Sequence, residues 1–187
     1  MEYVVPIKDI SKINKMKSIL EESSLRDYAL FVIGINTGIQ AQHLLLLKVS
    51  DVWNGKTVHE FLCIKDEKTN EKTDHYLNKN VQLALKKYLK NSNLSQNDYL
   101  FKSTRDDKPI SRQQAYRIIN LAAKKAGIEG KIGTHTMRKT FGYHAFRKGV
   151  AISILMKIFH HHSSSETLKY IGITEGEKKQ VRVDVNL

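Results

Sequence analysis

The chain has 187 residues, 41% of them apolar and 27% charged, which is typical of one soluble globular domain and excludes a disordered chain. Its single cysteine, Cys63, excludes an intramolecular disulfide and a zinc site built from several cysteines. Thirty-one Lys and Arg against nineteen Asp and Glu give a net charge of +12, which favours a polyanionic partner such as nucleic acid. The apolar runs are too short to cross a bilayer and no secretory signal opens the chain, so we expect no membrane association and a reducing, cytoplasmic location.

The first fifty residues have the apolar spacing of helices. Asp9 is a suitable cap for a helix with apolar side chains on one face. Ser24 and Asp27 resemble a capping box, and they predict a second helix that ends near Gly38. A short third helix is predicted over residues 42–48.

The pattern then changes to one typical of strands. Residues 57–64 are rich in β-branched and aromatic side chains, and residues 74–77 form a second short extended candidate. The polar stretch 65–73 lies between them and is longer than a two-residue turn. We therefore expect one hairpin in this part of the chain.

The remainder returns to helical spacing. Ser111 and Gln114 form a capping box at the start of a strong helix that runs toward Gly127. Further helices are predicted over residues 79–89, 134–148, 151–159 and 164–171. The last sixteen residues, 172–187, are polar apart from an alternating apolar pattern at 181–185, which predicts an extra strand or a docking tail. The sequence thus predicts a single mainly α domain of the α+β class over residues 1–187, with a small antiparallel β-sheet.

Three local patterns in the last third carry chemistry. His135 and Arg138 lie three residues apart at the start of a predicted helix, so they share a face that suits a phosphate diester. The three histidines at 160–162 have no carboxylate or cysteine at ligand spacing, so we expect no metal site. Tyr170 by itself is typical of a packing residue with a hydrogen-bonded hydroxyl. Each pattern alone is weak.

Together and in this order, they resemble the C-terminal signature of the tyrosine recombinases, the phage-integrase family of site-specific DNA recombinases. The matching segments are the H-T-M-R box at 135–138 and IFHHHSSSETLKYIG at 158–172, in which His161 stands nine residues before Tyr170. Upstream, residues 27–52 are similar to the first box of the family, and residues 65–89 to its β-hairpin and following helix. The resemblance implies the helical catalytic domain of this family, double-stranded DNA and further protomers as partners, and no metal or small-molecule cofactor.

The resemblance also implies residue roles. Tyr170 would attack a scissile phosphate and form a 3′-phosphotyrosyl bond, which stores the energy of the phosphodiester. Arg138 would hold a non-bridging oxygen and stabilise the charge of the transition state. His161 would donate a hydrogen bond to the phosphate, and His135 would assist proton transfer.

Basic residues complete the expected site. Lys68 in the hairpin is the best match for the lysine that protonates the leaving 5′-oxygen, and Lys65 and Lys72 remain alternatives for that role. We expect Lys65, Lys72, Arg112 and Lys139 to contact DNA.

One departure from the family pattern concerns the first box. It reads Thr37-Gly38-Ile39-Gln40, with Gln40 where the family has an arginine that clamps the phosphate together with Arg138. Glutamine keeps a hydrogen-bond donor but lacks the charge and the bidentate geometry. The acidic residue expected two or three positions later is also replaced, by Gln42 and His43.

These features define the expected function and its alternatives. We expect a site-specific recombinase that integrates a mobile element, bacterial or phage-derived and associated with the nucleoid. The N-terminal core-binding domain of the family is expected to be absent, so DNA affinity should be weak and steeply dependent on salt. One alternative is a catalytically impaired DNA-binding protein with an accessory or regulatory role, which Gln40 favours. A second alternative is an enzyme similar to type IB topoisomerases.

Overall fold

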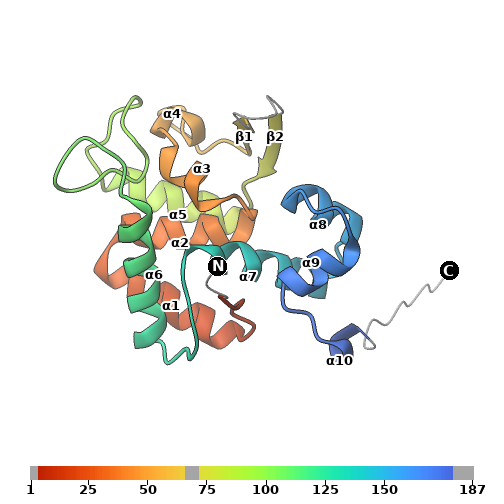
Figure 1. Ribbon diagram of the computed structural model, residues 1–187. Coiled ribbons are helices and arrows are strands. Elements are labelled where there is room, and N and C mark those ends of the chain that lie inside the picture. The colour runs from red at the N-terminus through yellow and green to blue at the C-terminus, as the bar shows by residue number, and fades with distance from the viewer. Residues whose placement is uncertain (1–3, 66–71, 179–187) are drawn as a thin grey trace.

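The structure is a computed structural model that describes residues 4–65 and 72–178 (Figure 1). Two antiparallel strands, β1 (Phe61–Lys65) and β2 (Lys72–Tyr76), form a small sheet. The helices in chain order are α1 (Ile10–Ser23), α2 (Leu25–Thr37), α3 (Ala41–Leu46), α4 (Val49–Val52), α5 (Lys79–Lys90), α6 (Arg112–Lys125), α7 (Thr134–Arg147), α8 (Ile152–Phe159), α9 (Ser164–Tyr170) and α10 (Glu175–Lys178). The predicted mainly α fold with a small antiparallel sheet is confirmed.

Local hydrogen bonds explain why several helices begin at the predicted residues. The side chain of Asp9 accepts from the backbone N–H of Ser11, and the hydroxyl of Ser24 accepts from that of Asp27. Ser111 and Gln114 make both hydrogen bonds of a capping box. Each cap satisfies backbone donors that a helix leaves unpaired at its first turn.

Other boundaries differ from those predicted. The first strand begins at Phe61 rather than at residue 57, because Val58 pairs with Trp53 and the N–H of His59 donates to the carbonyl of Val52. The short helices α4 and α10 were not predicted, since four residues are too few to show a helical period. The alternating stretch at 181–185 lies outside the described residues.

Apolar burial centres on α2. Its buried side chains divide between two clusters, one shared with α3, α5 and the hairpin and one shared with α1 and α6. A smaller third cluster lies under α8 and α9. Figure 1 shows α7 extending from the main body to these C-terminal helices, so α7 joins the two parts of the molecule.

The segment before α1 fixes the position of α7. The backbone N–H of Ile7 donates to the hydroxyl of Thr140 over 2.9 Å, and the carbonyl of Ile7 lies 2.9 Å from Nε2 of His144. The ammonium of Lys139 donates to the carbonyl of Val4 over 2.8 Å. These bonds hold one side of α7 in place while its other side carries the candidate site. In the described part of the chain, no helix is long and apolar enough to cross a membrane.

Candidate active site

Arg138 on α7 is the centre of the site. Its side chain is buried, with 8% of the residue exposed, and its guanidinium donates through Nη1 to the carbonyl of Gly38 and through Nη2 to the carbonyl of Ile158 over 3.0 Å. The guanidinium carbon lies 4.9 Å from the ring centroid of Phe159. Two carbonyls and an aromatic face offset the cost of burying the charge, although burial still lowers the pKa of Arg138.

Gly38 is required where the second helix ends. Its φ of +67° lies in the left-handed region, and a Cβ atom there would come within 2.5 Å of Phe141. This turn directs the carbonyl of Gly38 to Arg138. The side chain of Gln40, two residues later, lines the same small pocket as Arg138.

Tyr170, the last residue of α9, lies against this centre. Its ring packs 5.2 Å from that of Phe159 and 5.0 Å from that of His161, and the ammonium of Lys139 lies 5.1 Å above it. Burial raises the pKa of the Tyr170 hydroxyl, whereas the charge of Arg138 and a hydrogen bond from it lower that pKa. The phenol is thus partly buried and adjacent to the guanidinium.

His161 adopts one tautomer because of its neighbour Thr167. The hydroxyl of Thr167 donates a hydrogen bond to the carbonyl of Ser163 over 3.2 Å. Its oxygen therefore accepts a hydrogen bond from the N–H at Nδ1 of His161 over 3.0 Å. The other nitrogen, Nε2, lies 4.0 Å from the carboxylate of Glu166. Burial lowers the pKa of His161, and Arg138 adds to this effect while Glu166 opposes it.

His135 lies at the exposed start of α7. Partial burial lowers the pKa of its ring, and the charges of Arg112, Arg138 and Lys139 lower it further. The guanidinium of Arg112 on α6 donates to the amide oxygen of Gln42 on α3.

The predicted lysines differ in their position and exposure. Lys65 and Lys72 form the strand pair next to the segment that connects β1 to β2, and both are exposed. Lys68 lies outside the described residues. Lys139 is only 7% exposed and its ammonium donates to the carbonyl of Val4, and its contact with DNA stays a prediction. The sequence pattern could not reveal this burial, because the contact spans 135 residues.

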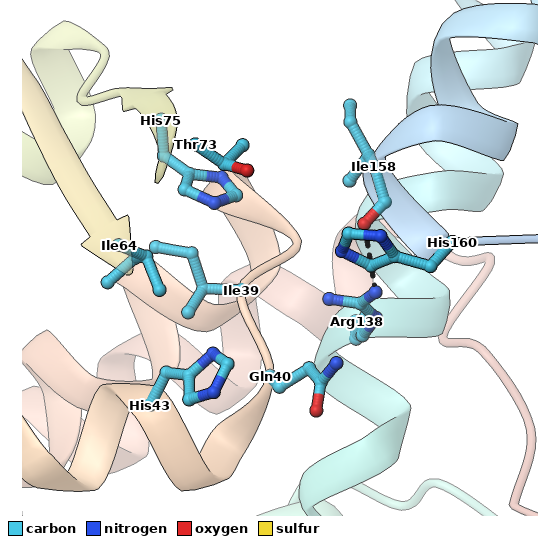
Figure 2. Close-up of a pocket in the computed structure, with 9 residues that line it drawn as sticks. All are labelled: Ile39, Gln40, His43, Ile64, Thr73, His75, Arg138, Ile158 and His160. Atoms are coloured by element: carbon cyan, nitrogen blue, oxygen red, sulfur yellow. Dashed lines mark hydrogen bonds between the residues drawn. The ribbon is translucent and has the colours of Figure 1, made fainter. Parts of the chain in front are cut away.

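Two histidines that sequence reasoning did not select line the pocket beside Arg138. Figure 2 shows His43 on α3 and His75 on β2 on the side of this pocket opposite Arg138. Nδ1 of His75 donates to the carbonyl of Thr37 over 3.3 Å. The sequence signals that pointed to this region were Gln40 in place of the family arginine and the absence of the usual acidic residue near position 43.

A larger hollow of about 630 Å³ adjoins this pocket and shares Gln40, His43 and Ile64 with it. It lies between α3 and β1, and its rim carries Lys65 and Arg112. The site therefore combines a phenol, a buried guanidinium and several imidazoles with a basic rim, which is chemistry suited to a phosphodiester. Within residues 4–65 and 72–178, no group of three His, Cys, Asp or Glu side chains is arranged to hold a metal ion.

Comparison with known proteins identifies the class. A family model described as the phage integrase family matches residues 5–177, so the chain belongs to the phage integrase family. A probable integrase/recombinase of Bacillus subtilis (strain 168), YoeC, is 42% identical over 175 residues, which are 94% of this chain and 93% of YoeC. The tyrosine recombinase XerA of Pyrococcus furiosus is 25% identical, and the match covers 94% of this chain and 60% of XerA.

Solved structures share the fold. A crystal structure of XerA recombinase aligns with a TM-score of 0.75 at 24% identity, covering 98% of this chain and 66% of that one. The post-cleavage complex of XerH with its palindromic difH substrate aligns with a TM-score of 0.73 at 17% identity, covering 94% of this chain and 52% of that one. The chain thus spans nearly all of YoeC but about 60% of the length of XerA.

Proposed function

We propose that this protein breaks and rejoins DNA at specific sites through a covalent bond between Tyr170 and a 3′-phosphate. The observation that carries the proposal is the position of the Tyr170 phenol beside the buried guanidinium of Arg138, with His161 packed against the same ring. The proposed nucleophile and the proposed transition-state cation thereby lie together, beside an imidazole whose Nε2 can donate a hydrogen bond to the phosphate when the ring is protonated.

In the proposed reaction, the phenolic oxygen of Tyr170 attacks phosphorus as its proton leaves, with His135 assisting the transfer. The bond from phosphorus to the 5′-oxygen breaks, and that oxygen takes a proton and becomes a 5′-hydroxyl. Lys68 is the proposed proton donor, with Lys65 and Lys72 as alternatives. One phosphodiester replaces another, so the reverse attack by a 5′-hydroxyl rejoins the strand without an energy source.

Double-stranded DNA is the proposed substrate. The net charge of +12, the exposed cations Lys65 and Arg112 in the lining of the larger hollow, and the exposed Lys72 paired with Lys65 support this choice. Contacts of this kind release counterions, so affinity should fall steeply as salt rises. The XerH complex with difH and a lambda integrase dimer on a COC′ core site support a DNA-bound assembly of several protomers. The proposed place of action is the bacterial nucleoid in the cytoplasm.

Gln40 favours one alternative, a DNA-binding accessory protein without cleavage activity. Loss of a transition-state arginine in a different phosphoryl transfer costs on the order of 10³–10⁵ in rate. The alternative is decided by whether a covalent adduct forms.

The test uses nicked duplexes with a randomised core, in which cleavage traps the protein on DNA. We expect a covalent adduct on a denaturing gel with the unaltered protein and none with Tyr170→Phe. Tyr28→Phe is the matched control, because Tyr28 lies near Glu21 and Lys87, away from the pocket. Binding without any adduct would reject the enzyme and favour the accessory protein. Adducts without sequence preference would favour a topoisomerase-like activity.

A further inference from the structure

The pocket beside Arg138 is small and unusually rich in imidazoles. Its volume is about 30 Å³, which is room for a water-sized group such as a phosphate oxygen. Its polar lining consists of Gln40, His43, Thr73, His75, Arg138 and His160, shown together in Figure 2. The pocket lies where α3, the hairpin, α7 and the end of α8 meet, so its lining residues come from segments that are far apart in the sequence.

Arg138 alone has limited capacity for a phosphate. Both terminal nitrogens already donate to carbonyls, those of Gly38 and Ile158, and the guanidinium also hydrogen bonds to Tyr170, so few of its N–H groups remain for a phosphate. A phosphodiester carries two non-bridging oxygens, and both gain charge as the nucleophile attacks. Gln40 contributes at most a neutral amide. Additional donors must therefore come from the remaining lining of the pocket.

The ring of His43 is held in position by a chain of hydrogen bonds. Arg112 can only donate, and it donates to the side-chain oxygen of Gln42, so the amide nitrogen of Gln42 is the atom that faces Nε2 of His43 at 3.3 Å. In the neutral ring, Nε2 of His43 accepts a hydrogen bond from this amide, and Nδ1 carries the ring proton. The imidazole is thus fixed in orientation on the edge of the pocket.

His75 is fixed from the opposite strand. It pairs in register with the buried Leu62, which turns its side chain to the inner side of the hairpin. Nδ1 donates to the carbonyl of Thr37, so Nε2 is the nitrogen that can take up a second proton. Burial lowers the pKa of His75, and the charges of Arg138 and His43 lower it further while Asp74 raises it.

Charge around the two rings is predominantly positive. The titratable and charged groups that face them from the surrounding elements are Asp51 on α4, Cys63 and Lys65 on β1, Asp74 on β2, Arg112 on α6, Arg138 on α7 and His160 after α8. A phosphodiester anion in the pocket would offset this excess and favour protonation of His75, whereas His43 can donate to it through Nδ1 as a neutral ring.

We propose that His43 and His75 bind the phosphate oxygens that the first-box arginine would otherwise bind, so that Gln40 marks a relocation of positive charge and not its loss. This inference rests on the proposed function, because it assigns donors to the same phosphate. Proton uptake accompanies phosphate binding, and binding is tighter at pH 6 than at pH 8.

A titration of the histidine rings by NMR tests the proposal without cleavage. The probe is dimethyl phosphate, a minimal phosphodiester, added to the full chain. We expect the probe to raise the titration midpoint of His75 and to shift the ring resonances of His43. The ring resonances of His59 and His144 should not move, because their rings contact the backbone outside the pocket. An unchanged midpoint for His75, unmoved ring resonances for His43, or equal shifts in all four rings would overturn the proposal.

A compensation experiment tests the same donors in the reaction. The double variant His43→Ala/His75→Ala should form adducts about 10²-fold more slowly in a single turnover, the usual cost of lost transition-state donors. Adding Gln40→Arg to that double variant should raise its rate of adduct formation at least tenfold. The control variant His59→Ala should form adducts at the rate of the unaltered protein. A double variant as fast as the unaltered protein, or a triple variant no faster than the double, would overturn the proposal.

The two experiments separate the two claims. If the unaltered protein forms no adduct, the proposed cleavage fails, and the ring titration alone decides whether His43 and His75 bind a phosphodiester. Thermal unfolding of each variant shows whether it is folded. If His75→Ala does not fold, His75→Gln takes its place, because the glutamine amide can keep the bond to Thr37 without gaining charge.

Discussion

The main body and the C-terminal helices differ in how firmly they are held. The body, up to α7, contains two large clusters of buried apolar side chains that meet at α2. Helices α8 and α9 rest on a third cluster whose buried members in the described chain are Tyr143, Leu155, Phe159, Ile171 and Ile173. The body carries Arg138, His43 and His75, and the smaller part carries His160 and Tyr170. The nucleophile thus belongs to the part with less buried area to resist local opening.

Arg138 and Gly142 on α7 both contact the smaller part at the site. Arg138 donates to the carbonyl of Ile158 and lies over the ring of Phe159. Gly142 on α7 allows close approach, since a Cβ atom there would come within 2.5 Å of Ile171 and 2.6 Å of Phe159. The groups expected to act in the reaction therefore also hold Tyr170 in place. Substitutions that remove these contacts should change the stability of the two parts unequally.

The largest effect is expected from Arg138→Ala. It removes the transition-state cation and leaves the buried carbonyls of Gly38 and Ile158 without their donor. We expect adduct formation to fall by about 10³-fold or more. The free energy of unfolding should fall by about 2–4 kcal/mol, measured by urea denaturation.

Arg138→Lys separates the two effects. Lysine keeps the charge but cannot reach two carbonyls and a phosphate with one ammonium. Relative to Arg138→Ala, Arg138→Lys should regain a larger share of the lost free energy of unfolding than of the lost cleavage rate. Equal recovery of both would show that charge alone, and not the forked geometry, matters at this position.

A smaller and more localised effect is expected from Gly142→Ala. The added methyl group collides with Ile171 and Phe159, and overpacking of this kind costs about 1–3 kcal/mol. Hydrogen exchange should become faster in residues 152–173 while α2 and α5 remain protected. Gly176→Ala is the matched control, because no atom lies within 4 Å of its added Cβ. Faster exchange throughout the chain would mean that the two parts open together.

The sequence predicted the parts of this structure that depend on neighbouring residues. Asp9, Ser24 and Ser111 begin helices where expected, because a cap acts within three residues. The order of the boxes also indicated the family, which the match over residues 5–177 confirms. Whether Tyr170, Arg138 and His161 act in catalysis remains a prediction, although the structure brings them together.

Features that depend on distant contacts were not predictable in this way. The buried ammonium of Lys139 donates to the carbonyl of Val4, and no local pattern predicts a contact with a residue 135 positions away. His75 faces the pocket only because its strand pairs in the register that places it opposite Leu62, and a shift of one residue would turn it outward. His43 depends on Arg112 and Gln42, which meet from separate helices. Long-range geometry decides each of these cases.

The smallest effect is expected from Glu177→Gln, which weakens a third connection between the two parts. The carboxylate of Glu177 accepts from the ammonium of Lys8 over 2.9 Å and from the hydroxyl of Tyr143 over 2.9 Å. Burial raises the pKa of Glu177, but hydrogen bonds from Thr174, Lys8 and Tyr143 outweigh it and lower that pKa to about 2. Because the groups are partly exposed and screened by solvent, we expect a loss below about 1 kcal/mol at pH 7.

The pH dependence of this loss identifies its origin. A carboxyl whose pKa is lowered on folding stabilises the folded state above its ordinary pKa of 4.5, and this contribution disappears as the pH falls toward about 2. The difference between Glu177→Gln and the unaltered protein, measured by urea unfolding, should therefore shrink between pH 7 and pH 3. Glu129→Gln, at an exposed position, should change stability at neither pH. A difference that stays constant with pH would show that Glu177 acts through packing, and the connection between Lys8 and the C-terminal helices would then not be electrostatic.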